Sequence, residues 1–238
     1  GTAVSTAEEF ANMKPDGKYY LAAVITLTAS FGEFSGTFDG NGKTVTTSVP
    51  VFAKVTGTVK NLTVAGEING TDTVAALAVE ADGATIEKVT NKANVNTSKG
   101  HAAGIVALLN GNASTVAGCT NKGKIYGHHW TGGICGLIDL TTTITGCGNY
   151  GDIESRNSIA GGIAGRLSSG EKVASPENIV FTLKNCTNYG SVIGRDDETA
   201  GIVGWVERVI YIEYCFNYGN ISSPNKGAAG VVGHIGAD

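Results

Sequence analysis

The sequence is poor in charge, in proline and in long apolar runs. Charged residues make up 16% of its 238 residues, against about 25% in an average soluble protein, and only 4 residues are proline. The net charge is -4, which is the wrong sign for a protein that binds nucleic acid through a basic face. The apolar stretch Ile105 to Leu109 is far shorter than the ~20 residues of a membrane-spanning helix. We therefore expect neither a nucleic-acid partner nor a membrane span.

Glycine, by contrast, is abundant, with 35 of the 238 residues, about twice the usual share. The glycines follow no strict three-residue period, which excludes collagen. The hydrophobic share of 42% argues against disorder. The length suits one β-rich domain over residues 1–238.

A repeat of about 28–30 residues runs through most of the chain. Its first half has the form apolar-x-x-Cys-x-Asn-x-Gly-x-apolar, and its second half is a short apolar run such as Gly161-Gly-Ile-Ala164. One repeat is longer, because an insertion lies near residues 168–178. The first halves, the first of them a weaker match, are Val59–Ile68, Ile86–Val95, Val116–Ile125, Ile144–Ile153, Leu183–Val192 and Ile212–Ile221.

The repeat predicts an all-β fold, a right-handed parallel β-helix, or β-solenoid. Apolar residues alternate over short runs, which is typical of strands, and no unit holds a helical period long enough for a helical repeat. Propeller blades need about 40–45 residues each. In a solenoid, equivalent residues of successive coils stack about 4.8 Å apart. We expect residues 46–238 to form the coils and residues 1–45 to form a cap of one short helix and strands.

The cap is expected to begin with a helix over Thr6–Asn12, with Thr6 as its N-cap. A strand is predicted over Tyr19–Leu27 and a tight turn over Phe38–Lys43. At the other end no cap is visible. Either residues 235–238 cover the last coil, or the chain is a piece of a longer protein.

Stacking of the coils predicts three ladders of identical side chains. The cysteines are expected to form a buried stack of free thiols, and the asparagines to hydrogen-bond from coil to coil at a turn. The tyrosines are expected either to seal a sheet edge or to offer a flat aromatic surface. The ladder residues are Cys119, Cys147, Cys186 and Cys215, then Asn91, Asn121, Asn149, Asn188 and Asn217, and last Tyr150, Tyr189 and Tyr218.

The segment Phe34–Lys43 and the recurring Asn-Tyr-Gly and Ala-Gly-Gly-Ile units resemble bacterial surface proteins with GLUG-like, glycine-rich β-helix repeats. The resemblance covers roughly residues 30–238. The cap together with the Trp-bearing coils also resembles the β-helical starch-adherence domain of a gut clostridial amylosome. These resemblances imply an extracellular, cell-surface location, a place in a larger multidomain protein or complex, and starch as a ligand.

Catalytic and metal-binding patterns are weak. Asp152 and Glu154 lie on one strand face, but no neighbouring coil adds the further carboxylates that a hydrolase needs. Zinc-type cysteine spacing and repetitive acidic calcium motifs are absent. We therefore predict no catalytic residue, no metal and no cofactor.

A binding site is expected on the turns that follow each repeat's first half, because turns that break a ladder carry function in solenoids. Stacked coils would join these turns into one strip that combines an aromatic ring with polar groups, a mixture that suits sugars. Trp130 is its expected centre, although Trp130 folded over the corner of the coil is the alternative. Trp205 is expected to be a packing residue. The predicted binding residues are Lys99, His101, Tyr126, His128, His129, Trp130, Arg156, Asn157 and Asp196.

These observations predict a non-catalytic, extracellular carbohydrate-binding module that holds a polysaccharide around Trp130. Starch or another α-glucan follows from the resemblance alone. An adhesin or rigid spacer is the alternative, and a polysaccharide lyase or hydrolase is a third possibility that would need converging carboxylates.

Overall fold

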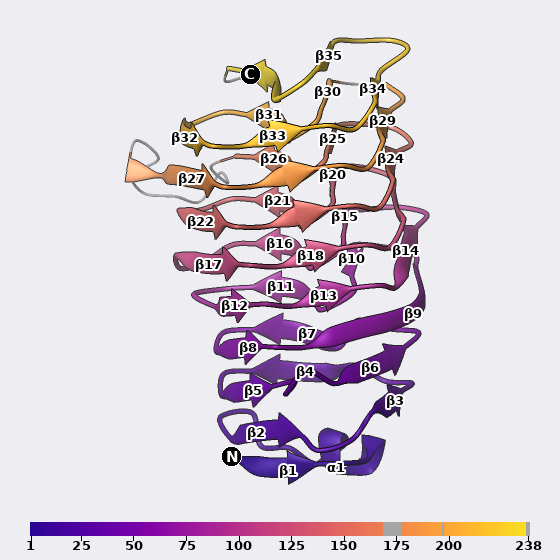
Figure 1. Ribbon diagram of the computed structural model, residues 1–238, viewed down its shortest axis with the longest axis vertical. Coiled ribbons are helices and arrows are strands. Elements are labelled where there is room, and N and C mark those ends of the chain that lie inside the picture. The colour runs from indigo at the N-terminus through magenta and orange to yellow at the C-terminus, as the bar shows by residue number, and fades with distance from the viewer. Residues whose placement is uncertain (169–177, 197, 237–238) are drawn as a thin grey trace.

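The chain folds into a stack of β-coils with the two termini at opposite ends (Figure 1). The computed structural model describes residues 1–168, 178–196 and 198–236, so most of the predicted insertion near 168–178 lies outside the described residues. Strands of successive coils pair in parallel, as in Thr120↔Gly148 and Ile125↔Ile153. The predicted parallel β-helix is thereby confirmed.

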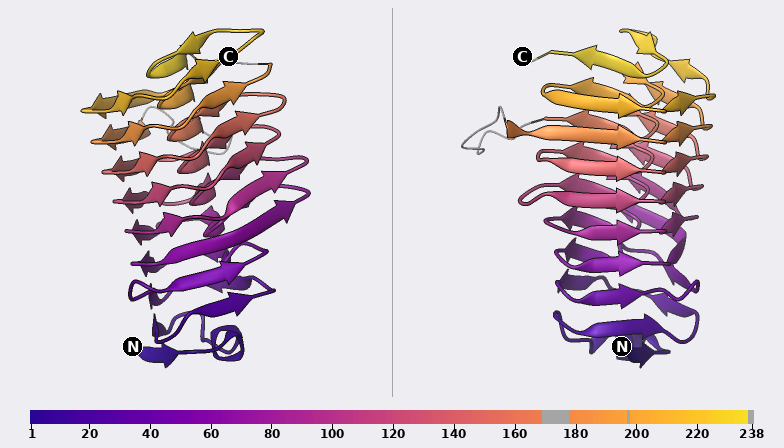
Figure 2. Two further views of the ribbon diagram at one scale, coloured as in Figure 1. Left: turned by 45° about the vertical axis from the view of Figure 1, so that its right-hand side comes forward. Right: turned by 60° about the vertical axis from the view of Figure 1, so that its left-hand side comes forward.

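Each complete coil visits four parallel sheets in a fixed order (Figure 2). The coil that starts at β17 runs through sheet 1, the two limbs of sheet 2, sheet 3 and then sheet 4. The long strand β9, Thr63–Gly70, joins the two limbs of sheet 2, because it pairs with both β13 and β14.

Among the described residues the sheets contain nine, thirteen, six and eight strands. Sheet 1 consists of β1 Thr2–Val4, β2 Lys18–Leu21, β5 Thr37–Asp39, β8 Thr58–Lys60, β12 Thr85–Glu87, β17 Ser114–Ala117, β22 Thr142–Thr145, β27 Val180–Lys184 and β32 Val209–Glu213. Sheet 2 consists of β3 Ile25–Leu27, β6 Thr44–Thr47, β9, the first limb β13 Thr90–Asn91, β18 Thr120–Asn121, β23 Gly148–Asn149, β28 Thr187–Asn188 and β33 Phe216–Asn217, and the second limb β14 Asn94–Thr97, β19 Ile125–Gly127, β24 Ile153–Ser155, β29 Val192–Gly194 and β34 Ile221–Ser222. Sheet 3 consists of β10 Val74–Ala75, β15 Ala102–Ala103, β20 Thr131–Gly132, β25 Ala160–Gly161, β30 Thr199–Ala200 and β35 Ala228–Ala229. Sheet 4 consists of β4 Phe31–Phe34, β7 Phe52–Val55, β11 Ala78–Ala81, β16 Val106–Leu109, β21 Cys135–Ile138, β26 Ala164–Leu167, β31 Val203–Val206 and β36 Val232–Ile235.

The N-terminal cap closes the first coil with a short helix, α1, Ala7–Ala11. Thr6 is its N-cap, as predicted, and the Thr6 hydroxyl accepts a hydrogen bond from the amide of Glu9 at 3.1 Å. Phe10 is buried and meets the rings of Phe31 and Phe38 edge-on. The predicted strand over Tyr19–Leu27 is two strands, β2 and β3. Among the described residues no helix is long and apolar enough to cross a membrane.

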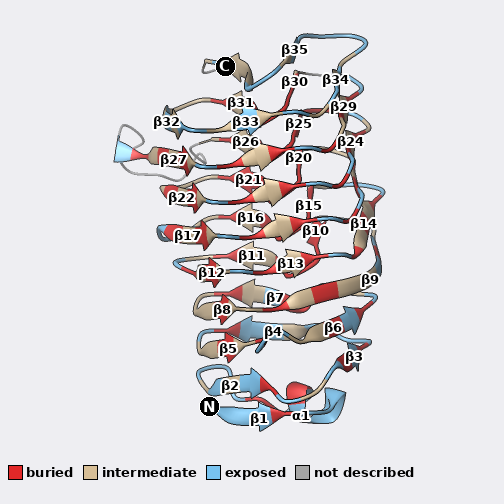
Figure 3. Ribbon diagram, viewed as in Figure 1, coloured by how far each residue is buried: buried red, intermediate tan, exposed pale blue. Residues whose placement is uncertain are grey.

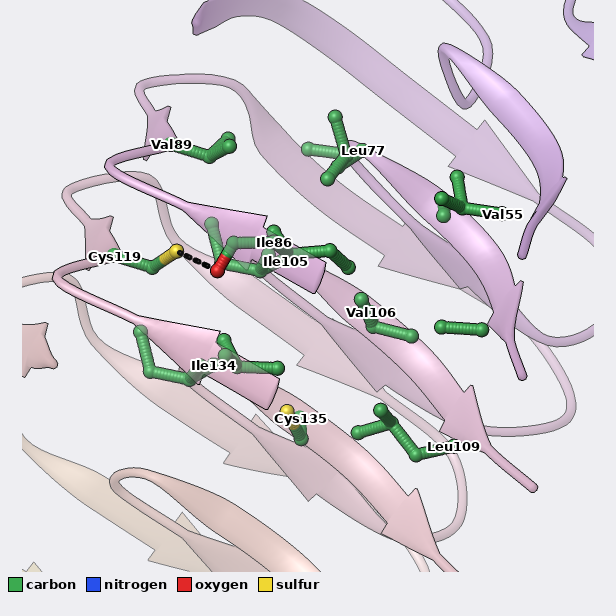
Figure 4. Close-up of a cluster of buried hydrophobic side chains, with 14 of the residues drawn as sticks. Val55, Leu77, Ile86, Val89, Ile105, Val106, Leu109, Cys119, Ile134 and Cys135 are labelled. Atoms are coloured by element: carbon green, nitrogen blue, oxygen red, sulfur yellow. Dashed lines mark hydrogen bonds between the residues drawn. The ribbon is translucent and has the colours of Figure 1, made fainter. Parts of the chain in front are cut away.

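A continuous core of aliphatic side chains runs along the inside of the coils (Figures 3 and 4). Leu77, Ile105 and Ile134 lie on successive coils and are completely buried. Four of the five free cysteines are buried, and the Cys119 thiol lies 3.8 Å from the Ile86 carbonyl oxygen (Figure 4). The predicted interior stack of thiols is confirmed, although Cys215 in the last coil is only half-buried.

The asparagine ladder is confirmed and holds the coils together from inside. The side-chain amide of Asn121 donates to the Asn149 side-chain oxygen at 2.7 Å, and Asn149 donates in the same way to Asn188. Each amide also donates to a carbonyl two residues ahead, as Asn149 does to Gly151 at 2.8 Å. The ladder therefore closes a turn within each coil and links each coil to the next.

Sheet 3 packs closely against sheet 4 because the contacting residues are small. Ala75, Ala103 and Ala107 form a small apolar cluster separate from the main core. A Cβ added to Gly165 of sheet 4 would lie 2.8 Å from the amide nitrogen of Thr131 in sheet 3. This contact brings the residues just before each sheet 3 strand next to the outward-facing residues of sheet 4.

The turn between sheet 1 and sheet 2 requires a left-handed backbone in every coil from Asn61 onward. This position is taken by glycine in two coils and by other residues in four, and all six have φ between 51° and 62°: Asn61, Lys88, Gly118, Gly146, Asn185 and Tyr214. A side chain fits there, since the nearest atom to a Cβ on Gly146 is 3.9 Å away. The penalty for a non-glycine residue is therefore backbone strain alone.

We expect Gly146→Ala to lower the free energy of unfolding by about 1 kcal/mol, because alanine pays the left-handed strain without a steric clash. Lys88→Gly should raise the free energy of unfolding by roughly 0.5 kcal/mol, since glycine relieves the same strain at an entropic cost. Urea denaturation followed by circular dichroism measures both. Equal shifts of the same sign would contradict the strain argument.

Candidate functional site

The turns between sheet 2 and sheet 3 stack into the strip that the sequence predicts. The amide of His129 donates to the Gly100 carbonyl at 2.9 Å, and the amide of Asn157 donates to the His128 carbonyl at 3.1 Å. One coil further, the amide of Arg195 donates to the Ser155 carbonyl at 3.1 Å. Backbone hydrogen bonds thus hold the variable turns in register, and their side chains share one corner of the solenoid.

The predicted binding residues divide into two groups on this corner. On the sheet 2 side, the Arg156 guanidinium lies 3.8 Å from the Tyr126 ring centre and donates to the Asn96 side-chain oxygen at 2.8 Å. Arg195, on the next coil, pairs with Glu154 at 2.7 Å. On the sheet 3 side lie the aromatic and histidine residues, which form the more extensive cluster.

Three predicted residues take little part in either group. Lys99 is exposed, and its amide donates to the Thr97 hydroxyl at 3.3 Å. Asp196 is also exposed and accepts a hydrogen bond from the Asn225 side chain at 3.1 Å. Asn157 is likewise exposed, and its amide makes the backbone hydrogen bond of the turn to His128. Whether any of the predicted residues binds a ligand stays a prediction.

The sheet 3 side carries a column of five stacked side chains, which we call the aromatic column: His101, Trp130, Arg166, Trp205 and His234. The His101 and Trp130 rings are parallel, with centres 4.4 Å apart. The Arg166 guanidinium lies 4.5 Å from the Trp130 ring and 5.6 Å from the Trp205 ring. Trp205 then stacks on His234 at 3.9 Å.

Two different ladders of the repeat build this column. His101 and Trp130 directly precede β15 and β20 of sheet 3, and their coils are adjacent, since the Ala102 amide donates to the Trp130 carbonyl at 3.3 Å. Arg166, Trp205 and His234 occupy one register position of sheet 4. The packing of sheet 3 on sheet 4 places the first ladder beside the second.

The column gathers residue types that are rare in this chain. The sequence has 2 tryptophans and 4 histidines, and both tryptophans with two of the histidines belong to the column. The two remaining histidines lie beside it: the His128 ring contacts the His129 ring edge-on at 4.6 Å, and the His129 ring lies 6.1 Å from the His101 ring. All six rings therefore lie on one face of the solenoid, contributed by residues more than 130 positions apart in sequence.

Sequence reasoning missed Arg166, His234 and their carboxylate partners, and treated Trp205 as a packing residue. A signal was present, because all three follow the same second-half pattern, as in Gly-Ile-Ala-Gly-Arg166 and Gly-Ile-Val-Gly-Trp205. Aligning that position alone reveals a ladder of unusual residues. It does not reveal that the ladder meets Trp130.

Trp130 has no free ring face. His101 from the preceding coil covers one side, and Arg166 from the following coil covers the other. The tyrosine row behaves similarly, with Tyr150, Tyr189 and Tyr218 stacked face to face at 4.7 and 5.3 Å. A ring that is stacked on both sides presents its edge rather than a flat face, so Trp130 does not offer the open aromatic plane on which a pyranose ring packs.

Carboxylates flank the column at its C-terminal part. Glu207 pairs with Arg166 and accepts a hydrogen bond from the Ser168 hydroxyl at 2.6 Å. Glu198 lies 4.0 Å from the His234 ring nitrogen. Burial raises the pKa of Asp139 to about 6, although the charge of Arg166 opposes that rise.

Several buried polar atoms of this face have no hydrogen-bond partner among the described residues. They are the Trp205 indole nitrogen, one Glu198 carboxylate oxygen and the Nδ1 atoms of His101 and His128. Unsatisfied buried groups are costly and are usually explained by function or by a missing partner. The face thus holds both donors and acceptors with unused hydrogen-bonding capacity.

The histidines of the column make stability depend on pH. Burial, with the charges of His129 and Arg166, lowers the pKa of His101 to about 4. Between pH 6.5 and 4 the unfolded chain therefore binds a proton at His101 that the folded chain does not bind, and stability falls as the pH falls. The loss from this residue is expected to reach about 3 kcal/mol at pH 4.

Asp139 has the opposite effect on stability. Its pKa is raised to about 6, so the folded chain binds a proton at Asp139 before the unfolded chain does, and this residue adds stability as the pH falls. The His101 effect is therefore read from a difference, the pH dependence of the wild type minus that of His101→Gln, from urea denaturation at pH 7.5 and 4.5. The wild type should lose more stability than the variant. Identical losses would show that the His101 ring is not buried as described.

The pKa is raised for Cys135, Cys147, Cys186 and Cys215, so these four cysteines offer no reactive thiolate at neutral pH. Hydrogen bonding to Cys147, together with burial, raises the pKa of Cys186 to about 12. Burial raises the pKa of Cys135 as well. In the part of the chain that the structure describes, no three His, Cys, Asp or Glu side chains come together as metal ligands would.

Comparison with known proteins gives matches among solved structures alone. No family model matches the chain, and no curated protein matches it. One similar structure is a candidate immunoglobulin A1 protease from Bacteroides ovatus, with a TM-score of 0.79 and 15% identity over 97% of this chain and 83% of that one. Another is an IgA1 protease, with a TM-score of 0.69 and 18% identity over 96% of this chain.

The chain shares its fold with these two proteins. Identities of 15% and 18% support the fold and nothing finer. The chain spans only 20% of the length of the second structure, so that protein contains much more than a solenoid of this size.

The comparisons contradict the predicted carbohydrate-binding module. Both similar structures are named as peptidases, one of them as a candidate, and neither is named for a carbohydrate. The physical reason for the error is that the prediction needed an exposed Trp130 face, whereas both faces of that ring are covered. The resemblance to GLUG-like repeats has no support from any family model, and the resemblance to a starch-adherence domain has none from the similar structures.

Proposed function

We propose that the chain is the β-solenoid module of an extracellular IgA1 protease-like protein, and that it binds the protein substrate on the face of the aromatic column. The fold likeness to the two IgA1 protease structures supports the class of protein. The gathering of both tryptophans and all four histidines on one face supports the binding role, and it is the observation that carries the proposal. Immunoglobulins are secreted proteins, which accounts for the extracellular location.

The chemistry of the column suits a protein surface. Tryptophan and arginine are the residues most often found at the energetic centres of protein interfaces, where they are rigid, large and able to donate hydrogen bonds. The indole N–H of Trp205 and a carboxylate oxygen of Glu198 are available as donor and acceptor. A peptide group offers the matching acceptor and donor, and small shifts at this face would let them meet.

The module is proposed to bind the substrate without cutting it. Hydrolysis of a peptide bond needs an activated nucleophile or a metal-bound water. The thiols of Cys135 and Cys186 are inside the solenoid with raised pKa values. His234 has Glu198 beside it, but no hydroxyl or thiol is paired with His234 among the described residues.

The test is binding of human IgA1 to the immobilised chain by biolayer interferometry, with the IgA1 then run on a denaturing gel to look for cleavage. We expect saturable binding and intact IgA1. Trp205→Ala should weaken binding by at least ~10-fold, as expected for a central interface residue. Tyr189→Ala, which removes an exposed ring directly after β28, should change binding less than about 2-fold.

Three outcomes would overturn parts of this proposal. Absence of binding would remove IgA1 as the partner. Binding that survives Trp205→Ala, in a variant whose circular dichroism is unchanged, would move the binding surface away from the aromatic column. Cleavage of IgA1 by the chain alone would show that the module is catalytic.

A further inference from the structure

The N-terminal part of the aromatic column adjoins three neighbouring histidine rings, which we call the histidine cluster: His101, His128 and His129. The His128 ring meets the His129 ring edge-on at 4.6 Å, and the His129 ring lies 6.1 Å from the His101 ring. The coils that carry the cluster are internal, because β15 and β20 each have a partner strand on both sides. The surroundings of these rings therefore do not depend on either end of the chain.

His101 is the ring that covers one side of Trp130, with the two rings parallel and their centres 4.4 Å apart. His101 belongs to the turn over residues 98–101, which precedes β15. This turn is held to the next coil by the His129 amide, which donates to the Gly100 carbonyl at 2.9 Å. The Ala102 amide then donates to the Trp130 carbonyl at 3.3 Å. If the turn moves outward, both hydrogen bonds break and one face of Trp130 is uncovered.

The charges that act on the His101 ring are mostly positive. His129 contributes from the neighbouring turn and Arg166 from β26, and both oppose a proton on His101. The Asp72 carboxylate has the opposite effect, but it is exposed, so water and salt screen it. A proton on His101 is therefore placed beside a guanidinium and a second titratable ring.

His128 and His129 face further charges on the same corner of the solenoid. These are Lys99, Arg156, the ion pair of Arg195 with Glu154, and Asp196, whose carboxylate accepts a hydrogen bond from Asn225. Lys99 and Arg156 lie on the coils directly before and after the two histidines, whereas Asp196 is two coils away. The nearest charges without an ion-pair partner among the described residues are therefore positive.

The closed arrangement of the rings resists protonation. Burial, with the charges of His129 and Arg166, lowers the pKa of His101 to about 4, and burial with the charge of His128 lowers the pKa of His129. A protonated imidazole donates from both ring nitrogens, yet the Nδ1 atoms of His101 and His128 are buried without a hydrogen-bond partner among the described residues. A solvated histidine accepts a proton near pH 6.5, so acid favours an arrangement that returns these rings to water.

We propose that the histidine cluster is an acid-sensitive latch, which keeps Trp130 covered at neutral pH and, when protonated, releases the turn over residues 98–101 and exposes one face of Trp130. Arg166 stays on the other face, since a guanidinium keeps its charge at every pH in this range and Arg166 is paired with Glu207. The latch changes the shape of the face on which the substrate is proposed to bind, and its consequence for binding rests on that proposed function. The opening itself does not.

The test is amide hydrogen exchange of the intact chain at pH 7.5 and 4.5, with each rate compared with that of an unstructured peptide at the same pH to give a protection factor. If opening returns the pKa of His101 from about 4 to about 6.5, the opening equilibrium rises roughly 70-fold between these pH values. The protection factors of the His129 and Ala102 amides should fall by that factor or more. Unchanged protection factors would overturn the proposal.

A second comparison separates the latch from unfolding of the whole solenoid. At pH 4.5 the His129 and Ala102 amides should be at least ~10-fold less protected than the Tyr150 amide, because the latch opens while the coils stay folded. The Tyr150 amide donates to the Asn121 carbonyl at 2.8 Å, next to the asparagine ladder. Equal protection of the two sets would show that they open together, and the proposal would be wrong.

Two variants of the same turn provide the matched control. His101→Gln removes the titrating ring, so its His129 and Ala102 amides should lose less than about 10-fold of their protection between the two pH values. Lys99→Gln removes an exposed lysine of the same turn and should show the pH dependence of the wild type. A wild-type pH dependence in His101→Gln would overturn the role of the cluster.

The exposure of Trp130 is read directly in a Trp205→Phe variant, where Trp130 is the sole tryptophan. Its acrylamide quenching constant should be at least ~2-fold higher at pH 4.5 than at pH 7.5, because release of His101 opens one ring face to the quencher. A constant that does not rise would mean that the ring stays covered, which contradicts the latch. None of these measurements uses IgA1, so failure of the latch is distinguishable from failure of the proposed substrate site.

Discussion

Replacing Gly162 with alanine is expected to lower the free energy of unfolding by about 3 kcal/mol, at the upper end for overpacking a core. Gly162 lies in the link between sheets 3 and 4, where the chain crosses close to the asparagine ladder. A Cβ built there falls 2.2 Å from the Gly201 carbonyl oxygen and 2.5 Å from the Asn188 side-chain carbon. One neighbour is backbone and the other is a fully buried, hydrogen-bonded amide, so neither can move aside cheaply.

The matched control is Gly32→Ala in β4. No atom lies within 4 Å of a Cβ built on Gly32, and its φ is outside the left-handed region. We expect a change within about 0.5 kcal/mol, as for ordinary surface substitutions. Urea denaturation followed by circular dichroism compares the two variants. If Gly162→Ala were as stable as Gly32→Ala, the close approach of the chain to the ladder would be wrong.

The second large effect is expected for Asn149→Leu, which should destabilise the fold by about 4 kcal/mol. Leucine has the same branching as asparagine but larger terminal groups, so the change removes the hydrogen bonds and also crowds a buried site. The side chain of Asn149 is completely buried, donates to Gly151 and Asn188, and accepts from Asn121. Its loss strands a carbonyl, an amide N–H and an amide oxygen inside the solenoid, at about 1–3 kcal/mol each before relaxation.

Asn94→Leu serves as the control for this prediction. Asn94 is half-exposed and donates to the Glu67 carboxylate at 2.7 Å, where water can replace the lost partner. We expect a loss of at most about 1 kcal/mol, measured in the same denaturation experiment. Similar losses for the two variants would mean that the buried ladder adds no more stability than a surface hydrogen bond.

Much of the fold was predictable from the repeat. Cysteine, asparagine and tyrosine each return at one repeat position, and a solenoid places equivalent positions on top of one another. The thiol stack, the asparagine hydrogen bonds and the tyrosine row follow from this rule, and the structure shows all three. The N-cap at Thr6 follows from local chemistry alone.

The site was only partly predictable. The turn strip of His128, His129 and Trp130 could be found because it breaks the repeat, but the state of the Trp130 ring could not. A tryptophan in a variable turn is equally consistent with an open face and with a covered one. His101 and Arg166, from the coils on either side, cover the Trp130 ring. The carbohydrate interpretation required an open face on that ring.

The sequence by itself determined the coil, its ladders and the corner on which the variable turns gather. The reason is that periodicity specifies which residues stack along the solenoid axis. Only the tertiary structure decided that the Trp130 ladder of sheet 3 meets the Arg166, Trp205 and His234 ladder of sheet 4. The distance between two ladders depends on how the chain bends within one coil. That bend depends on the close packing of Ala103, Ala107 and Gly165, and the period of the repeat does not encode it.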